Sequence, residues 1–357
     1  EGGKAIQTMV KDTNKVLRVS NASADWRGYV DFVNNVVVSG LSEVVQTSLS
    51  YLLDQLDPAT IAKEDKLPMV EVKMDLVSQK QPDDTRKDAI VFQPDLGETG
   101  NGKGMRDLVN SWIGSFFQVS TLFKRLDNEG SYLREIHTDY NVKILLAMIN
   151  ETLSDNEEKC MEIKMNYDEY TYLWSTNLEE HFATFKEDAQ VTTVNGQSLI
   201  DLKKFDAEIS KYEKIRDQIN GFTSPKDIGW LRVNTQPVKT QLMTWTSRWV
   251  DMYVQFLKQT VNERLSNLDS FMRKISAGLD IEVVEGKEGK EALMTVMEDI
   301  RDVRKTMDTT LEIFAPLQEV LHCLKAHGSD IALLPKVADH SIQDYLDEAP
   351  LLWDAVV

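Results

Sequence analysis

One apolar stripe constrains this chain more than any other feature of its sequence. Large apolar side chains recur at steps of three to five residues over the segment 242–275, and this spacing places them on one face of an α-helix. At 1.5 Å per residue the stripe predicts a helix of roughly 50 Å. Its members are Leu242, Trp245, Trp249, Met252, Phe256, Val261, Leu265, Leu268, Met272 and Ile275. Because so long an apolar face must pack against other helices, we expect helical bundles.

Two further segments show the same periodicity. Apolar residues from Phe205 to Ile219 and from Leu293 to Leu311 recur at helical spacing, so each predicts another helix of the bundles. We expect these helices to be antiparallel and the bundles to be elongated. Pro316 follows the third stripe, and a proline inside a helix costs about 3 kcal/mol because it lacks an N–H and clashes with the preceding turn. The sequence therefore predicts a break or kink near Phe314.

The segment 67–96 is an exception to the helical pattern. From Val70 to Leu76 apolar and charged residues alternate, and a period of two indicates a strand with one buried face. Ala89–Phe92 is a plausible second strand, and the polar segment between them carries Pro82. The two strands predict a β-hairpin with a long loop. Since two strands alone are marginally stable in water, the hairpin should pack on helices or pair with another sheet edge.

The loop after this hairpin approaches a phosphate-binding motif. Gly97, Gly102 and Lys103 form the pattern G-x-x-x-x-G-K, which in nucleotide-binding proteins cradles phosphates and is followed by a Ser or Thr that holds Mg²⁺. Here Gly104 takes that position, and Asp95 and Glu98 add negative charge that opposes an anion. The alternating strands and helices of a parallel sheet do not recur downstream. We interpret the loop as a flexible connector, with a nucleotide-dependent enzyme as one alternative hypothesis.

A second candidate site lies near the end of the chain. Cys323 and His327 are four residues apart, so they share one helix face and could bind a metal together. Two ligands do not make a site, and His322 and His340 would have to fold back to complete it. We expect a buried thiol beside a solvated histidine, and no catalytic, cofactor-binding or metal-binding residue. Cys160 is the only other cysteine, which is too few for a disulfide framework and fits a reducing compartment.

Charge limits the partners of the chain. Its formal net charge is −18 and no cluster of Lys and Arg is longer than a pair, so we expect no nucleic-acid and no membrane partner. We also find no apolar run near the ~20 residues that a bilayer span requires. Basic or neutral protein surfaces are the expected partners.

Several sequence segments, taken in their order along the chain, resemble segments of one protein family. They are YDEYTYLW (167–174), GWLRVNTQPVKTQLMTWTSRW (229–249), IFAPLQEVLHCLKAHG (313–328) and YLDEAPLLWDAVV (345–357). Together they resemble axonemal dynein heavy chains, most closely the outer-arm beta class, from about Leu67 onward. The resemblance implies a tail, or stem, segment that leads into the linker ahead of the ATPase ring. It implies that the segment is no enzyme and has no cofactor, whereas the full-length chain would be a microtubule-motor ATPase.

The resemblance also implies a role, partners and a location. The segment would transmit force between the ring and the cargo doublet and serve motor assembly in the cytoplasm and in the axoneme of a cilium or flagellum. Its partners would be other dynein heavy chains, intermediate and light chains, and neighbouring axonemal proteins. The alternative from composition alone is a non-motor helical scaffold or adaptor protein.

We expect a mainly α fold whose elongated antiparallel bundles carry one small β-hairpin. The expected parts are a helical tail segment (1–66), the hairpin (67–96), a helical bundle (97–194), a long-helix bundle (195–327) and the start of the linker (328–357). Pro350 is expected to begin a new helix at its first turn. That helix would be cut short at the end of the chain, so Trp353 should be partly exposed.

Overall fold

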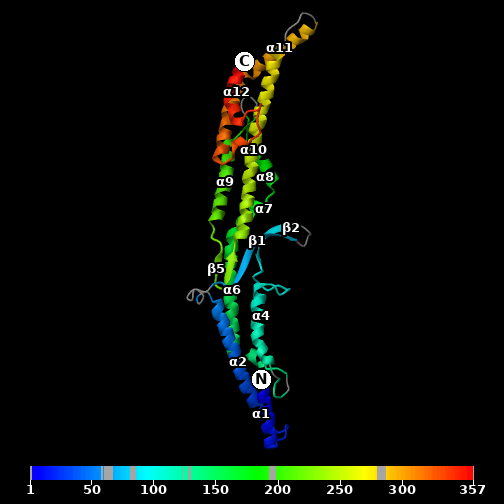
Figure 1. Cartoon of the computed structure of the whole chain (residues 1–357), viewed down its shortest axis with the longest axis vertical. Coiled ribbons are helices and arrows are strands. Elements are labelled where there is room, and N and C mark those ends of the chain that lie inside the picture. The colour runs from blue at the N-terminus through cyan, green and yellow to red at the C-terminus, as the bar shows by residue number, and fades with distance from the viewer. Residues whose placement is uncertain are drawn as a thin grey trace. The chain divides into compact units, whose positions relative to one another are not determined.

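The computed structural model describes residues 2–57, 59, 67–80, 86–122, 124–127, 130–192, 198–279 and 287–356. The fold is mainly α-helical, as predicted, and the described residues also form a four-stranded sheet and a two-stranded sheet (Figure 1). Contacts divide the chain into two compact units, Glu1–Thr171 with Thr223–Gln241 and Tyr172–Phe222 with Leu242–Val357. The five parts expected from the sequence and their elongation stay predictions.

In each unit the helices and strands are given in the order in which they occur along the chain. The first unit contains α1 (Gly2–Leu17), α2 (Ala24–Leu56), β1 (Val70–Lys80), β2 (Arg86–Gln93), α4 (Met105–Phe117), η1 (Gln118–Thr121), α5 (Leu133–Thr138), α6 (Tyr140–Asp168), β5 (Lys226–Ile228), β6 (Leu231–Asn234) and the first residues of α10 (Gln236–Leu279). The second unit contains α7 (Tyr172–Ser175), α8 (Leu178–Asp188), β3 (Gln190–Thr192), β4 (Ser198–Ile200), α9 (Leu202–Gly221), the rest of α10, α11 (Lys287–Ala326), η2 (Ile331–Leu333) and α12 (Ile342–Val356).

The predicted hairpin is present and forms part of a larger sheet. Strands β1 and β2 pair antiparallel with Leu76 opposite Ile90, while the polar loop with Pro82 lies outside the described residues. The other edge of β1 pairs in parallel with β6, where Val72 lies opposite Val233, and β5 completes the order β2-β1-β6-β5. The hairpin therefore pairs with another strand, as its marginal stability required. We did not predict β5 and β6, because three or four residues are too few to show a clear period.

Helix α2 is a central element of the first unit and packs against α6, α4 and α5. Its buried face includes Val45, Leu49 and Leu56, which are 0% exposed. Contrary to our reading of the sequence, α2 is long and apolar enough to cross a membrane, since an 18-residue window has a mean hydropathy of 1.3. The core helix of a soluble protein passes the same test, so this is weak support for a membrane span.

The core of the second unit forms around α10, as the apolar stripe predicted. Trp249, Val261 and Ile275 are almost fully buried along it. Aromatic rings of α8 and α9 pack on the same helix: Phe185 lies 5.0 Å from Tyr253 between ring centroids, and Phe205 lies 5.5 Å from Phe256. The helix predicted from Leu293 onward is also present in α11, but Leu293 and Ile300 are 48% and 40% exposed, so its predicted stripe is only partly buried.

The predictions about prolines are wrong in two respects. Helix α11 continues through Pro316, so the predicted break near Phe314 is absent, and α12 continues through Pro350, which does not begin a helix. The other predicted outcome, a kink near Phe314, stays a prediction. The cost of a proline inside a helix, about 3 kcal/mol, is offset here by burial of one face of each helix. In α11 this face includes Phe314, Leu317 and Leu321, which are 6%, 1% and 2% exposed.

The predicted exposure of Trp353 is wrong as well. Its side chain is 0% exposed, and its ring centroid lies 6.0 Å from that of Phe271 on α10. Leu346 and Ala349, which are also 0% exposed, lie seven and four residues before it on the same face of α12. One uninterrupted helix thus gives Trp353 enough neighbours to be core.

Candidate functional site

The glycine loop before α4 is held by one carboxylate. Asp107 accepts hydrogen bonds at its Oδ2 from the Thr99 N–H at 2.9 Å, the Thr99 hydroxyl at 2.8 Å and the Gly104 N–H at 2.9 Å. These bonds, first among them that from the Thr99 N–H, lower the pKa of Asp107. Two main-chain donors of the loop thus point at an internal carboxylate, whereas a phosphate-binding loop directs such donors at the ligand.

The loop is also closed tightly. Gly104 lies so close to Gly97 that a Cβ on Gly104 would be 1.9 Å from the Gly97 carbonyl oxygen. The main chain of Lys103 donates to the Thr99 hydroxyl at 2.9 Å. The loop connects strand to helix as predicted, but its own hydrogen bonds fix its shape. We keep as a prediction that it binds no nucleotide.

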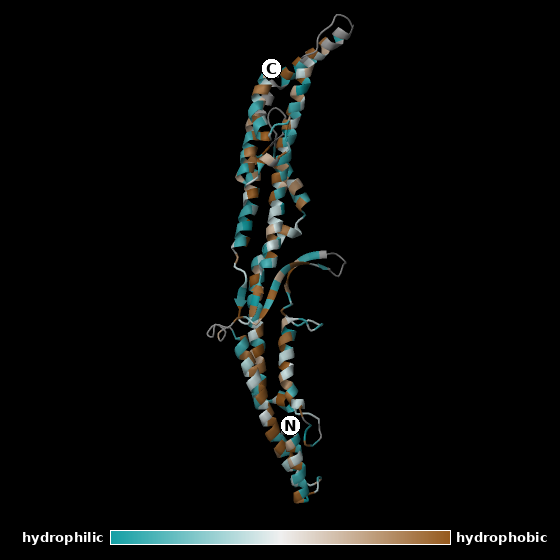
Figure 2. Ribbon diagram, viewed as in Figure 1, coloured by the Kyte–Doolittle hydropathy of each residue, from teal (hydrophilic) through white to brown (hydrophobic). Residues whose placement is uncertain are grey.

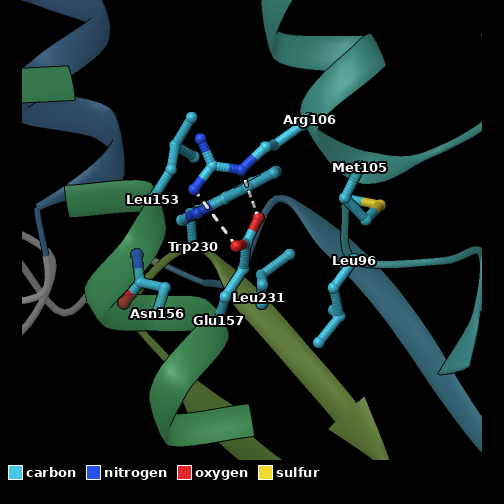
Figure 3. A pocket seen from close by; sticks show the side chains of 8 residues that line it. All are labelled: Leu96, Met105, Arg106, Leu153, Asn156, Glu157, Trp230 and Leu231. Carbon is cyan, nitrogen blue, oxygen red and sulfur yellow. Dashed lines mark hydrogen bonds and ion pairs between the residues drawn. The ribbon is translucent and has the colours of Figure 1, made fainter. Parts of the chain in front are cut away.

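Next to this loop is a small cavity whose lining includes an ion pair. The guanidinium of Arg106 on α4 donates to Glu157 on α6, with Nε 2.6 Å from Oε1 and Nη2 3.1 Å from Oε2. Figure 3 shows the two side chains extending toward each other, with Trp230 beside them. The cavity measures about 10 Å³ and is lined by Leu96, Met105, Arg106, Leu153, Asn156, Glu157, Trp230 and Leu231. It has room for about one water molecule, so it suits packing between α4 and α6 and not substrate binding.

The Cys323 and His327 pair predicted from the sequence is extended by two carboxylates of α9. The Nδ1 atom of His327 lies 2.9 Å from Glu213 Oε2, and its Nε2 atom lies 2.9 Å from Asp206 Oδ1. The Sγ atom of Cys323 is 3.9 Å from the same Asp206 oxygen. We call these four residues the α9–α11 cluster. It brings together residues more than one hundred positions apart in the chain.

The surroundings of this cluster partly differ from the expectation. Cys323 is a buried thiol, as predicted, but the His327 side chain is only 7% exposed and is not solvated. His322 is exposed, and His340 faces Glu348 at 3.7 Å, outside the cluster. We missed Asp206 and Glu213, although their spacing of seven residues places them on one face of the predicted helix.

Electrostatics within the α9–α11 cluster favour protonated groups. Burial lowers the pKa of His327, but its hydrogen bonds to Asp206 and Glu213 outweigh burial, so the net pKa is raised. Burial and the nearby charge of Asp206 raise the pKa of the Cys323 thiol to about 11. Without a bound cation, the thiol is therefore neutral at pH 7 and not a nucleophile.

Comparison with known proteins gives the family. No protein-family model matches the chain. Over 286 residues, or 80% of this chain, it is 34% identical to the dynein beta chain of the flagellar outer arm of Chlamydomonas reinhardtii. It is 24% identical over 343 residues to dynein axonemal heavy chain 17 of Homo sapiens, and 24% identical over 368 residues to the ciliary dynein beta chain of Tripneustes gratilla. The chain belongs to the axonemal dynein heavy chains.

This dynein chain matches only a small part of its relatives. It spans 6% of the Chlamydomonas protein, 7% of the human protein and 8% of the Tripneustes protein. The flagellar, ciliary and axonemal relatives support a location in the axoneme of a cilium or flagellum. The resemblance to the outer-arm beta class agrees with the 34% identity to that chain.

Proposed function

We propose that this chain is a non-catalytic tail segment of a ciliary dynein heavy chain, which leads into the linker, transmits force between the ATPase ring and the cargo doublet, and serves motor assembly. The full-length chain would be a microtubule-motor ATPase. The non-motor adaptor alternative is set aside because the relatives are dynein heavy chains. The hydrogen bonds from main-chain donors of the Gly97–Gly104 loop to Asp107 favour this proposal over the nucleotide-enzyme alternative.

The observation that carries the proposed force transmission is the continuity of α10. It runs for 44 residues, or about 66 Å at 1.5 Å per residue. Side chains on it are buried from Leu242 to Ile275, and Trp249 is anchored by a hydrogen bond from its Nε1 to the Leu173 carbonyl at 2.9 Å. A packed helix resists bending because any change of its axis would break side-chain contacts along its length.

The experiment interrupts α10 without removing a buried side chain. Asp251 is exposed, and Asp251→Pro in the full-length heavy chain removes one main-chain hydrogen bond and kinks the helix. We expect the purified motor to keep its ATPase activity and to move microtubules more slowly. Asp251→Ala is the matched control and should behave as the unchanged motor.

Two results would contradict the proposal. Unchanged microtubule velocity in Asp251→Pro would show that α10 does not carry force. A loss of ATPase activity as large as the loss of velocity would show that the segment takes part in catalysis.

The second face of α2 supports the assembly role. Opposite its buried face, α2 exposes large apolar side chains at helical spacing, and Figure 2 shows hydrophobic residues along its length. We call this surface the α2 stripe, which consists of Tyr29, Phe32, Val36, Val44 and Tyr51, with exposures of 38%, 64%, 56%, 51% and 66%. A helix that is apolar on two faces normally has neighbours on both.

The charges beside the α2 stripe define the chemistry of the partner. Asp25, Glu43 and Asp54 are exposed and lie within the same half of the helix by their spacing. The only basic residue of α2 is Arg27, which donates to the Ala22 carbonyl. We therefore propose that the partner is an amphipathic helix with an apolar stripe and basic flanks. Other dynein heavy chains, intermediate and light chains and neighbouring axonemal proteins are the proposed sources of such a helix.

A further inference from the structure

The α9–α11 cluster has a donor set that suits a transition metal. Asp206, Cys323 and His327 each offer one ligand atom, and these three atoms lie within 4.8 Å of one another. A carboxylate oxygen, a thiolate sulfur and an imidazole nitrogen are the three ligand types that Zn²⁺ accepts in proteins. The sequence suggested two of these ligands, and the packing of α9 beside the end of α11 supplies the third.

The distances are close to those of a metal-bound state. Tetrahedral bonds of 2.0–2.3 Å to Zn²⁺ place the ligand atoms about 3.3–3.6 Å apart. Here Asp206 Oδ1 is 2.9 Å from His327 Nε2 and 3.9 Å from Cys323 Sγ. Shifts of less than about 1 Å would convert these contacts to the tetrahedral spacing.

The position of Glu213 gives an independent reason to infer a metal. Glu213 Oε2 lies 2.9 Å from His327 Nδ1, so this carboxylate can accept a hydrogen bond from Nδ1–H and fix the neutral tautomer in which Nε2 is free to be a ligand. A carboxylate on the second ring nitrogen is the usual arrangement around zinc-binding histidines. Glu213 therefore orients His327 toward Asp206 and Cys323 without itself being a ligand.

Access and burial also fit a site of this kind. Cys323 is buried near the end of α11, and the side chain of His327, just after it, is only 7% exposed, so few rotamers remain to be restricted on binding. The Asp206 side chain is 57% exposed, and this open side gives a cation a path from solvent.

We propose that Asp206, Cys323 and His327 bind Zn²⁺, with Glu213 holding the histidine and water as the fourth ligand. Binding involves no oxidation or reduction. The Cys323 thiol and the His327 Nε2–H each release a proton to solvent, and the metal remains Zn²⁺. The bound ion joins α9 to the end of α11. This inference does not depend on the proposed role in force transmission.

The test uses Co²⁺ as a spectroscopic probe and Zn²⁺ as its competitor. We expect the purified, reduced chain to bind one Co²⁺ with intense visible bands of tetrahedral cobalt and a near-ultraviolet thiolate-to-cobalt band, and Zn²⁺ to displace it. Cys323→Ser should abolish the thiolate band. Asp206→Asn, at a position whose side chain is 57% exposed, should keep that band and weaken Zn²⁺ binding at least tenfold in calorimetry.

Two further variants separate a built site from adventitious binding. Cys160→Ser changes the buried thiol of α6 and should leave both signals unchanged. Glu213→Gln should weaken Zn²⁺ binding by about 10- to 100-fold, as is usual for a residue that orients a ligand. The proposal is overturned if no thiolate band forms, if the band survives Cys323→Ser, or if Asp206→Asn binds Zn²⁺ as tightly as the unchanged chain. In each of these cases His327 serves only as an ion-pair partner of the two carboxylates.

Discussion

Trp353 illustrates how single residues of this dynein segment contribute to its core. The side chain is fully buried on α12 and its ring stacks near Phe271 of α10. Tyr345 of the same helix is 1% exposed, and its hydroxyl donates to Asp269 of α10 at 3.2 Å. The two aromatic residues thus hold α12 to α10 by burial at one point and by a hydrogen bond at the other.

The first prediction concerns the removal of this aromatic side chain. Trp353→Ala should lower the free energy of unfolding by about 3–5 kcal/mol, because a buried ring is lost and a cavity remains. Leu351→Ala is the matched control, since Leu351 lies on the same helix but is 72% exposed, and it should change stability by less than about 0.5 kcal/mol. Urea denaturation followed by circular dichroism measures both. Equal, small effects of the two variants would show that α12 is not part of the core.

The glycine loop and α4 act as one element. Asp107, the third residue of α4, satisfies the N–H of Gly104 just before the helix, which is a donor that a helix start otherwise leaves without a partner. The loop reaches this position because Gly104 has no Cβ to collide with the Gly97 carbonyl oxygen. Packing at the helix start thus accounts for both glycines' surroundings without a bound phosphate, in line with the prediction that the loop binds no nucleotide.

A second prediction follows from this close approach. Gly104→Ala should destabilise the chain by about 1–3 kcal/mol, because the new methyl group collides with the Gly97 carbonyl and forces a main-chain shift. Gly100→Ala should be nearly neutral, since a Cβ at that position has no atom within 4 Å. Thermal unfolding of the two variants gives the comparison. If Gly104→Ala were as stable as Gly100→Ala, the loop would be open in solution and its role would have to be reconsidered.

At the scale of the whole molecule, substitutions in the α2 stripe should affect assembly without affecting stability. Its residues are exposed, so polar substitutions there leave the core unchanged, yet they would disturb a partner helix that docks on the apolar surface. A carboxylate placed within the stripe would have to lose its hydration against the apolar stripe of the partner helix, which is costly unless the charge is paired.

The third prediction uses this separation. The double variant Phe32→Glu and Val36→Glu should change the unfolding free energy of the chain by less than about 1 kcal/mol. In the full-length heavy chain it should reduce incorporation into the axoneme, measured as the amount of heavy chain in isolated axonemes. Asn35→Glu is the control, because it adds charge at an exposed position outside the α2 stripe. Normal incorporation, or a large loss of stability, would contradict the assignment of this face to a partner.

The sequence by itself determined those helices and strands whose periodicity of apolar residues shows within a short segment. The stripe along α10 and the alternation in β1 were sufficient because helix and strand geometry fix which residues share a face. The same local spacing placed Cys323 beside His327 on one helix. Resemblance in the order of several phrases gave the dynein family, and the identity to the outer-arm beta chain confirmed it.

Only the tertiary structure decided which faces meet. Asp206 and Glu213 reach His327 across 121 and 114 residues, and no local period records that contact. Strands β5 and β6 exist because the open edge of β1 pairs with β6. Pro316 and Pro350 remain within helices, and Trp353 is buried. In each case the free energy of packing against residues distant in the sequence exceeds the local cost of a helical proline or of ordering the end of the chain.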